Sequence, residues 1–95
     1  MIVHMVCFKY KAEVDEAARA HHCERLQGLS DIDGVIDLKV GKDVVRSPRS
    51  YDTGLVSLFR DRSVLDAYTV HPQHVKVVEF GHTIIDTMAK VDFED

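Results

Sequence analysis

Residues 2–10 read Ile-Val-His-Met-Val-Cys-Phe-Lys-Tyr, "IVHMVCFKY". Branched and aromatic side chains dominate this stretch, which predicts a β-strand. The even positions include Val6 and Phe8 and the odd positions include Val3 and Met5, so both faces of the strand are largely apolar. A strand of this kind belongs at the centre of a sheet that is covered on both sides.

Three other segments also have the character of strands. Residues 53–61, "TGLVSLFRD", are apolar on both faces, as residues 2–10 are. Residues 33–43 and 88–95 instead alternate between apolar and charged side chains. Alternation of this kind is typical of a strand with one face in water. The sequence therefore predicts two central strands and two edge strands.

Helical spacing of apolar residues appears in three segments, which are residues 12–32, 62–70 and 72–88. Pro72 separates the last two, because proline interrupts a helix but is well suited to the first helical position. Ser63 and Asp66 have the spacing of a capping box and predict the start of the second helix.

The order of these elements is βαββαβ, with the last helix broken in two. This order predicts an α+β fold, the ferredoxin-like arrangement with an antiparallel four-stranded sheet. The helices cover one face of such a sheet and leave the other apolar, exposing either Met5, Leu55 and Phe59 or the opposite set of side chains. A large apolar patch is normally covered by a partner. We therefore expect a homodimer formed through the sheet face.

Length and composition narrow the possible functions. The 95 residues suit one domain spanning residues 1–95, and the net charge of −4 argues against nucleic-acid binding. No apolar run is long enough to span a membrane, and residues 1–11 lack the pattern of a signal peptide. Cys7 and Cys23 do not form a disulfide framework, so we expect a cytoplasmic protein with reduced thiols.

Four short segments carry a resemblance to a known family. They are "HMVCFKYK" (4–11), "VGKDV" (40–44), "AYTVHPQHV" (67–75) and "VDFE" (91–94). The sequence resembles the stress-responsive A/B barrel (Dabb) family over essentially its full length. The resemblance implies a dimeric α+β barrel built from two ferredoxin-like units.

The resemblance does not imply a single function. The Dabb family includes a plant polyketide cyclase that closes a ring by aldol condensation, boiling-stable stress proteins that form larger rings, and many bacterial proteins of unknown activity. The cyclase motif places catalytic residues at His74 and Tyr68, with His4 lining the same cavity. The cyclase also uses a tyrosine in its first helix, where this chain offers His21, His22 and Arg25 instead.

These side chains suggest acid–base chemistry on a small carbonyl compound, without a metal or organic cofactor. A neutral histidine can abstract a proton beside a carbonyl group, and a tyrosine can donate a hydrogen bond to the enolate that forms. His71, Tyr10 and His22 are further candidates for substrate binding. The alternative is that the histidines are structural and meet backbone groups in a filled core.

Three other interpretations remain open. The first is a non-catalytic stress-response or assembly protein, and the second is a cofactorless monooxygenase like related dimeric barrels. His4, His71 and His74 offer three nitrogens for a metal ion, although Pro72 spoils the usual helical spacing of such ligands. A cavity in which His74, Tyr68 and His4 converge would favour the enzyme over the structural protein.

Overall fold

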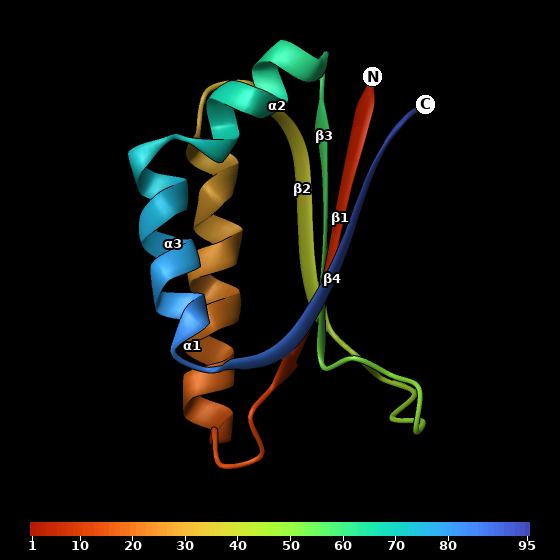
Figure 1. Cartoon of the computed structure of the whole chain (residues 1–95), viewed down its shortest axis with the longest axis vertical. Helices are drawn as coiled ribbons and strands as arrows, with labels where there is room; N and C mark the ends of the chain where they lie inside the picture. Colours follow the sequence, from red (N-terminus) through yellow and green to blue (C-terminus); the bar gives the residue numbers. More distant parts are fainter.

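The ferredoxin-like fold is confirmed by a computed structural model that describes residues 1–95. The elements are β1 (Ile2–Tyr10), α1 (Glu16–Gln27), a short 3-10 helix η1 (Gly28–Asp31), β2 (Val35–Lys42), β3 (Thr53–Phe59), α2 (Arg62–Thr69), α3 (Pro72–His82) and β4 (Ile85–Glu94). The strands form one antiparallel sheet in the order β2-β3-β1-β4. In Figure 1 the helices lie together on one side of this sheet.

The two strands with two apolar faces occupy the centre of the sheet, as predicted. Along β1 the side chains alternate, so that Val6 and Phe8 are buried under the helices while Met5 lies on the opposite face. Leu55 and Phe59 of β3 also face the helices, and Phe59 is completely buried. This layer of β1 and β3 side chains forms the core with Leu26, Leu29 and Ile32.

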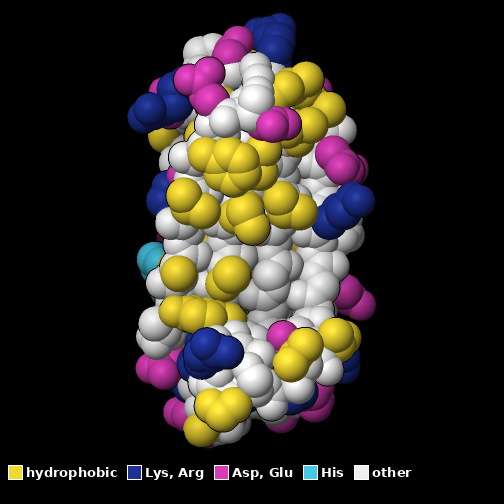
Figure 2. Space-filling view, turned by 90° about the vertical axis from the view of Figure 1, so that its right-hand side faces the viewer, with side chains coloured by type: hydrophobic (Ala, Val, Ile, Leu, Met, Phe, Trp, Pro, Cys, Tyr) yellow, Lys and Arg dark blue, Asp and Glu magenta, His cyan; other side chains and the backbone are white.

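The face of the sheet away from the helices is called the open face here. The predicted set of Met5, Leu55 and Phe59 is wrong because it mixes the two faces: Met5 lies on the open face, whereas Leu55 and Phe59 face the helices. The apolar side chains of the open face are Val3, Met5, Val56, Leu58, Val91 and Phe93. Met5 pairs with Val56 on one side and Val91 on the other, and Val91 is 53% exposed. Figure 2 shows hydrophobic side chains gathered on this face.

The predicted helix over residues 72–88 is too long. Helix α3 ends at His82, and Ile85 and Met88 belong to β4. The apolar periodicity misled the prediction because Ile85 and Met88 line the same cavity as the apolar face of α3, although they reach it from a strand. The run of β-branched residues at 83–85 is what favours a strand over another helical turn.

Two helix starts also differ from the prediction. Helix α1 begins at Glu16 and not at residue 12, because the Asp15 carboxylate accepts a hydrogen bond from the Ala18 amide and caps the helix. Helix α2 is capped by Asp61, which accepts hydrogen bonds from the Val64 amide and the Ser63 hydroxyl. The predicted capping box of Ser63 and Asp66 is therefore wrong.

In β2 a bulge between Val35 and Asp37 interrupts the alternation. Leu38 is buried as expected, but Ile36 turns outward and is 52% exposed. None of the helices has the length and apolar character needed to cross a membrane.

Candidate active site

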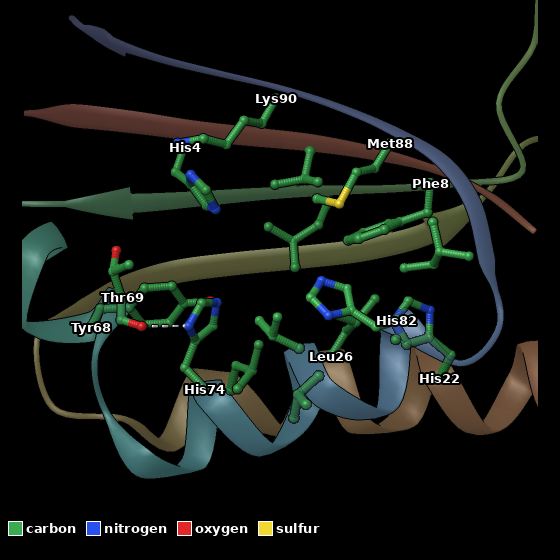
Figure 3. A pocket seen from close by; sticks show the side chains of 17 residues that line it. His4, Phe8, His22, Leu26, Tyr68, Thr69, His74, His82, Met88 and Lys90 are labelled. Carbon is green, nitrogen blue, oxygen red and sulfur yellow. Dashed lines mark hydrogen bonds between the residues drawn. The ribbon is translucent and has the colours of Figure 1, made fainter.

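A cavity of about 200 Å³ lies between the helices and the covered side of β1 and β4. Its walls are mainly apolar, with contributions from Val6, Phe8, Leu26 and Val77. Figure 3 shows the side chains that line it. Its lining also includes seven side chains with polar groups, which are His4, His22, Tyr68, Thr69, His74, His82 and Lys90.

Three of these side chains meet at one end of the cavity, which we call the reactive end: His4, Tyr68 and His74 (Figure 3). His4 comes from β1, Tyr68 from the last turn of α2 and His74 from the first turn of α3. The ring centres of Tyr68 and His74 are 4.5 Å apart, and those of Tyr68 and His4 are 6.2 Å apart. The structure thus brings together the three residues that the sequence singled out as catalytic.

His4 is held from behind by a carboxylate. Strand pairing places Asp92 of β4 directly opposite His4, and the ring Nδ1–H donates a hydrogen bond to the Asp92 carboxylate. Lys90 donates a second hydrogen bond to Asp92 over 2.8 Å. Burial opposes ionisation of Asp92, but these hydrogen bonds outweigh it and hold the pKa of the carboxyl below its usual value. The Nε2 atom of His4 is left free for a ligand.

His74 is held by the backbone. Its Nδ1–H donates to the Thr69 carbonyl over 3.0 Å, which leaves Nε2 with a lone pair. Burial lowers the pKa of His74, and the neighbouring His4 and His71 lower it further, while the bond to Thr69 opposes the change. His74 is therefore neutral at physiological pH.

Tyr68 supplies a hydrogen-bond donor with no competing partner. Its side chain is only 2% exposed and packs against Phe59, with ring centres 4.8 Å apart. Burial raises the pKa of Tyr68 to about 12, so the phenol keeps its proton. The hydroxyl makes no hydrogen bond within the chain and can donate to a ligand oxygen.

The turn between α2 and α3 positions Tyr68 and His74 on either side of Pro72. His71 caps α3, because its Nδ1 accepts a hydrogen bond from the Gln73 amide over 3.1 Å. His71 is not among the residues that line the cavity, so the structure does not bring this substrate-binding candidate to the site. It also does not assemble His4, His71 and His74 as a metal-binding group.

His22 lies toward the other end of the cavity, beside Phe8, with ring centres 5.1 Å apart. Its side chain is 1% exposed, and its Nδ1 is 2.7 Å from the Tyr10 hydroxyl. Burial, together with the charges of Arg25 and His21, lowers the pKa of His22 to about 4. Tyr10 lies behind His22 and lines a separate polar hollow. The structure therefore does not bring this substrate-binding candidate into the wall of the cavity.

The sequence did not identify Asp92 and Lys90 as members of this site. Both lie on the polar side of the last strand, which looks like an ordinary solvated edge. The signal that could have revealed Asp92 is the antiparallel register, which sets residue 92 beside residue 4. That register follows from the strand order but not from the pattern of either strand alone.

Solved structures with the same architecture support this description. A dimeric ferredoxin-like protein from Bacteroides fragilis is 22% identical, with a TM-score of 0.85 over 99% of this chain and 95% of that one. A Dabb family protein from Mesorhizobium loti is 24% identical, with a TM-score of 0.84 over the same shares of the two chains. A hydroxynitrile lyase from Passiflora edulis is 11% identical, with a TM-score of 0.87 over 97% of this chain and 90% of that one.

No curated protein matches the sequence. The family model of the stress responsive A/B barrel domain, however, matches residues 2–95, which is nearly the whole chain. The segments that carry the resemblance, including the histidines of "AYTVHPQHV", lie inside this match. The chain therefore belongs to the stress-responsive A/B barrel (Dabb) family.

Proposed function

We propose that this protein is a cofactor-independent enzyme that moves a proton at the carbon beside a carbonyl group. The observation that carries the proposal is the convergence of two imidazoles and an unpartnered phenol at one end of an apolar cavity. The mainly apolar walls favour a substrate with a hydrocarbon body. The hydroxynitrile lyase with this fold is itself an enzyme, which is consistent with catalysis on this scaffold.

His4 is the better placed of the two histidines to act as the base. The Asp92 carboxylate at its Nδ1 stabilises the imidazolium that forms when Nε2 takes a proton. His74 has only a neutral carbonyl behind its ring and a lowered pKa, so it is the weaker base. We assign His74 the role of a hydrogen-bond acceptor that orients the substrate.

Tyr68 completes the reaction step. The C–H bond beside the carbonyl breaks, its proton moves to Nε2 of His4, and its electron pair shifts to make an enolate oxygen. The Tyr68 hydroxyl donates a hydrogen bond to that oxygen, which gains negative charge only as the reaction proceeds. The enolate can then recover a proton or attack a second carbonyl, as in an aldol closure.

Deuterium exchange tests this proposal. A simple ketone such as octan-2-one is incubated with the protein in D₂O, and its α-proton signals are followed by NMR. We expect exchange above the buffer rate, and a loss of about 100-fold in the Tyr68→Phe variant, which lacks only the donor. His21→Gln is the matched control, since His21 lies outside the cavity.

The same spectra decide between the enzyme and the non-catalytic alternative. If octan-2-one neither exchanges nor perturbs the imidazole signals of His4 and His74, the histidines are structural and the catalytic proposal is wrong. Binding without exchange would leave a binding protein and would also reject the catalytic step.

We also propose that two copies of the chain pack through their open faces to form a dimeric barrel. The relative from Bacteroides fragilis is described as dimeric, and the open face carries an apolar patch that includes Met5, Val91 and Phe93. Met5→Asp places a charge in the middle of this patch and is expected to give monomers in sedimentation experiments. Val75→Asp, at an exposed position on α3, is the control. A Met5→Asp variant that remains dimeric would show that the subunits meet elsewhere.

A further inference from the structure

At the end of the cavity away from the reactive end, a polar atom of a buried histidine opens onto the cavity and has no partner within the chain. His22 is 1% exposed, and its Nδ1 is engaged by the Tyr10 hydroxyl. Its other nitrogen, Nε2, makes no hydrogen bond within the chain, although His22 lines the cavity. A polar atom that opens only onto a mainly apolar cavity is unfavourable unless a ligand or a water molecule in the cavity hydrogen-bonds to it.

The hydrogen bonds behind His22 decide what kind of partner Nε2 needs. The Tyr10 hydroxyl donates its single proton to Thr53 Oγ1 over 3.0 Å. The Tyr10 oxygen must therefore accept from the Nδ1–H of His22. Since a neutral imidazole carries one proton, Nε2 is a bare acceptor, and only a group with an O–H or N–H can satisfy it.

The protonation states of both groups are consistent with this arrangement. Burial lowers the pKa of His22 to about 4, so its ring is neutral at physiological pH. Burial also raises the pKa of Tyr10 to about 12, so the phenol keeps the proton that it gives to Thr53. The direction of each hydrogen bond is thus the same across the neutral pH range.

Gly81 leaves the approach to Nε2 open. A Cβ atom at this position would lie 3.5 Å from Nε2 of His22 and 3.1 Å from the Cδ1 of Ile85. Gly81 is buried within α3, where a glycine is less favourable than an alanine by about 1 kcal/mol. The absence of a side chain at Gly81 leaves space beside the imidazole of His22.

The distance between the two polar ends suits one extended small molecule. His74 and Gly81 are seven positions apart in α3, which is about 10 Å along the helix axis. The wall between them is mainly apolar and includes Val77, Leu26 and Val6, and His82 also lines the cavity. Figure 3 shows the two ends, with His4, Tyr68 and His74 on the left and His22 toward the right.

We propose that His22, backed by Tyr10 and Thr53, is a distal anchor that accepts a hydrogen bond from a hydroxyl group of the substrate. This inference rests on the proposed function, because the carbonyl of the same molecule occupies the reactive end. The substrate class is therefore a hydroxy ketone, with its two oxygens separated by an apolar body about 10 Å long.

Two matched ketones test the anchor. Octan-2-one has the carbonyl and the hydrocarbon chain, and 8-hydroxyoctan-2-one adds the terminal hydroxyl. Dissociation constants are measured by NMR titration, with the ¹⁵N signals of the histidine rings observed directly. We expect the hydroxy ketone to bind about tenfold more tightly and to shift the His22 Nε2 signal, which octan-2-one leaves in place.

Two variants test whether the tighter binding of the hydroxy ketone depends on Nε2 of His22. Gly81→Ala keeps His22 and its partners but places a methyl group over Nε2, and Ala is compatible with the helix. It is expected to abolish the preference while octan-2-one still binds. His22→Phe should do the same, and Gly81→Ala keeps the test valid if the phenylalanine variant does not fold. Equal binding of the two ketones by the wild type would overturn the anchor.

Failure of the anchor and failure of the proposed function give different results. If octan-2-one undergoes exchange and the hydroxyl adds nothing, the anchor is wrong and the catalytic proposal stands. If the hydroxyl preference depends on His22 but no ketone exchanges, the anchor stands and the catalytic proposal is wrong. If neither ketone binds, both are overturned.

Discussion

The two ends of the cavity each present a histidine whose Nδ1 is held from behind, but the groups that hold them differ. At the reactive end, His4 donates to the carboxylate of Asp92. The cavity-lining residues of β4 near Asp92 are exposed to solvent. At the distal end, His22 donates to the phenol of Tyr10 and is almost fully buried.

This difference decides what each imidazole can do. A carboxylate stabilises a positive ring, so His4 can take up a proton from a substrate. A phenol that stays protonated offers no such charge, and burial with Arg25 nearby disfavours a positive ring at His22. In our proposals the same kind of side chain therefore serves as a base at one end and as a neutral acceptor at the other.

The largest effect is expected from removing the base. His4→Phe should lower the exchange rate of octan-2-one by about 1,000-fold, in the range that general bases contribute. His22→Phe, at the neutral end, should change this rate by less than about threefold. The measurement is α-proton exchange in D₂O for both variants. Equal losses would show that the two histidines do not have separate roles.

The stability of the protein against pH tests the neutral state of His22. Its folded pKa of about 4 lies below the ordinary value of 6.5, so the unfolded chain binds the proton more tightly. The free energy of unfolding should therefore rise with pH between about 4 and 6.5 and level off above, by about 3 kcal/mol in total. Urea denaturation at several pH values measures it.

His74 also has a lowered pKa and adds to this slope in the same direction. The variant His22→Phe should lose the greater part of the pH dependence, and His74→Phe a smaller part. A slope that is unchanged in His22→Phe would place the titrating group elsewhere.

A smaller effect is expected from replacing Asp92, the carboxylate that accepts a hydrogen bond from His4. Asp92→Asn removes the charge and keeps the shape, and should lower the exchange rate by about tenfold at neutral pH. Glu94→Gln is the control, and Asp92→Glu should restore part of the rate. An exchange rate that is unchanged in Asp92→Asn would mean that Asp92 supports the fold only.

The fold was predictable because its signals are distributed along whole strands. Residues 2–10 and 53–61 are apolar on both faces, and this pattern alone places them at the centre of the sheet. The trio of His4, Tyr68 and His74 was predictable from the motif around Pro72 and the first strand. The open face was predictable as a surface, but its side chains were not, because the register that pairs Met5 with Val56 decides which residues of β1 and β3 share a face.

The parts that were missed depend on contacts between distant segments. Asp92 becomes a partner of His4 only through the antiparallel register of β1 and β4. Gly81 matters for the space beside His22, which is a property of how α1 and α3 pack. The end of α3 was misplaced because Ile85 continues the helical spacing into a strand. Patterns within one segment do not contain this information.

Consecutive residues of β1 serve opposite sides of the sheet: His4 points into the cavity and Met5 points away from it. A single peptide unit therefore connects the proposed base, His4, to the surface on which we expect the second subunit. A shift of the backbone at Met5 also moves His4, because the two residues are adjacent in a strand that is paired on both sides. The proposed dimer contact and the proposed base therefore depend on the same stretch of backbone.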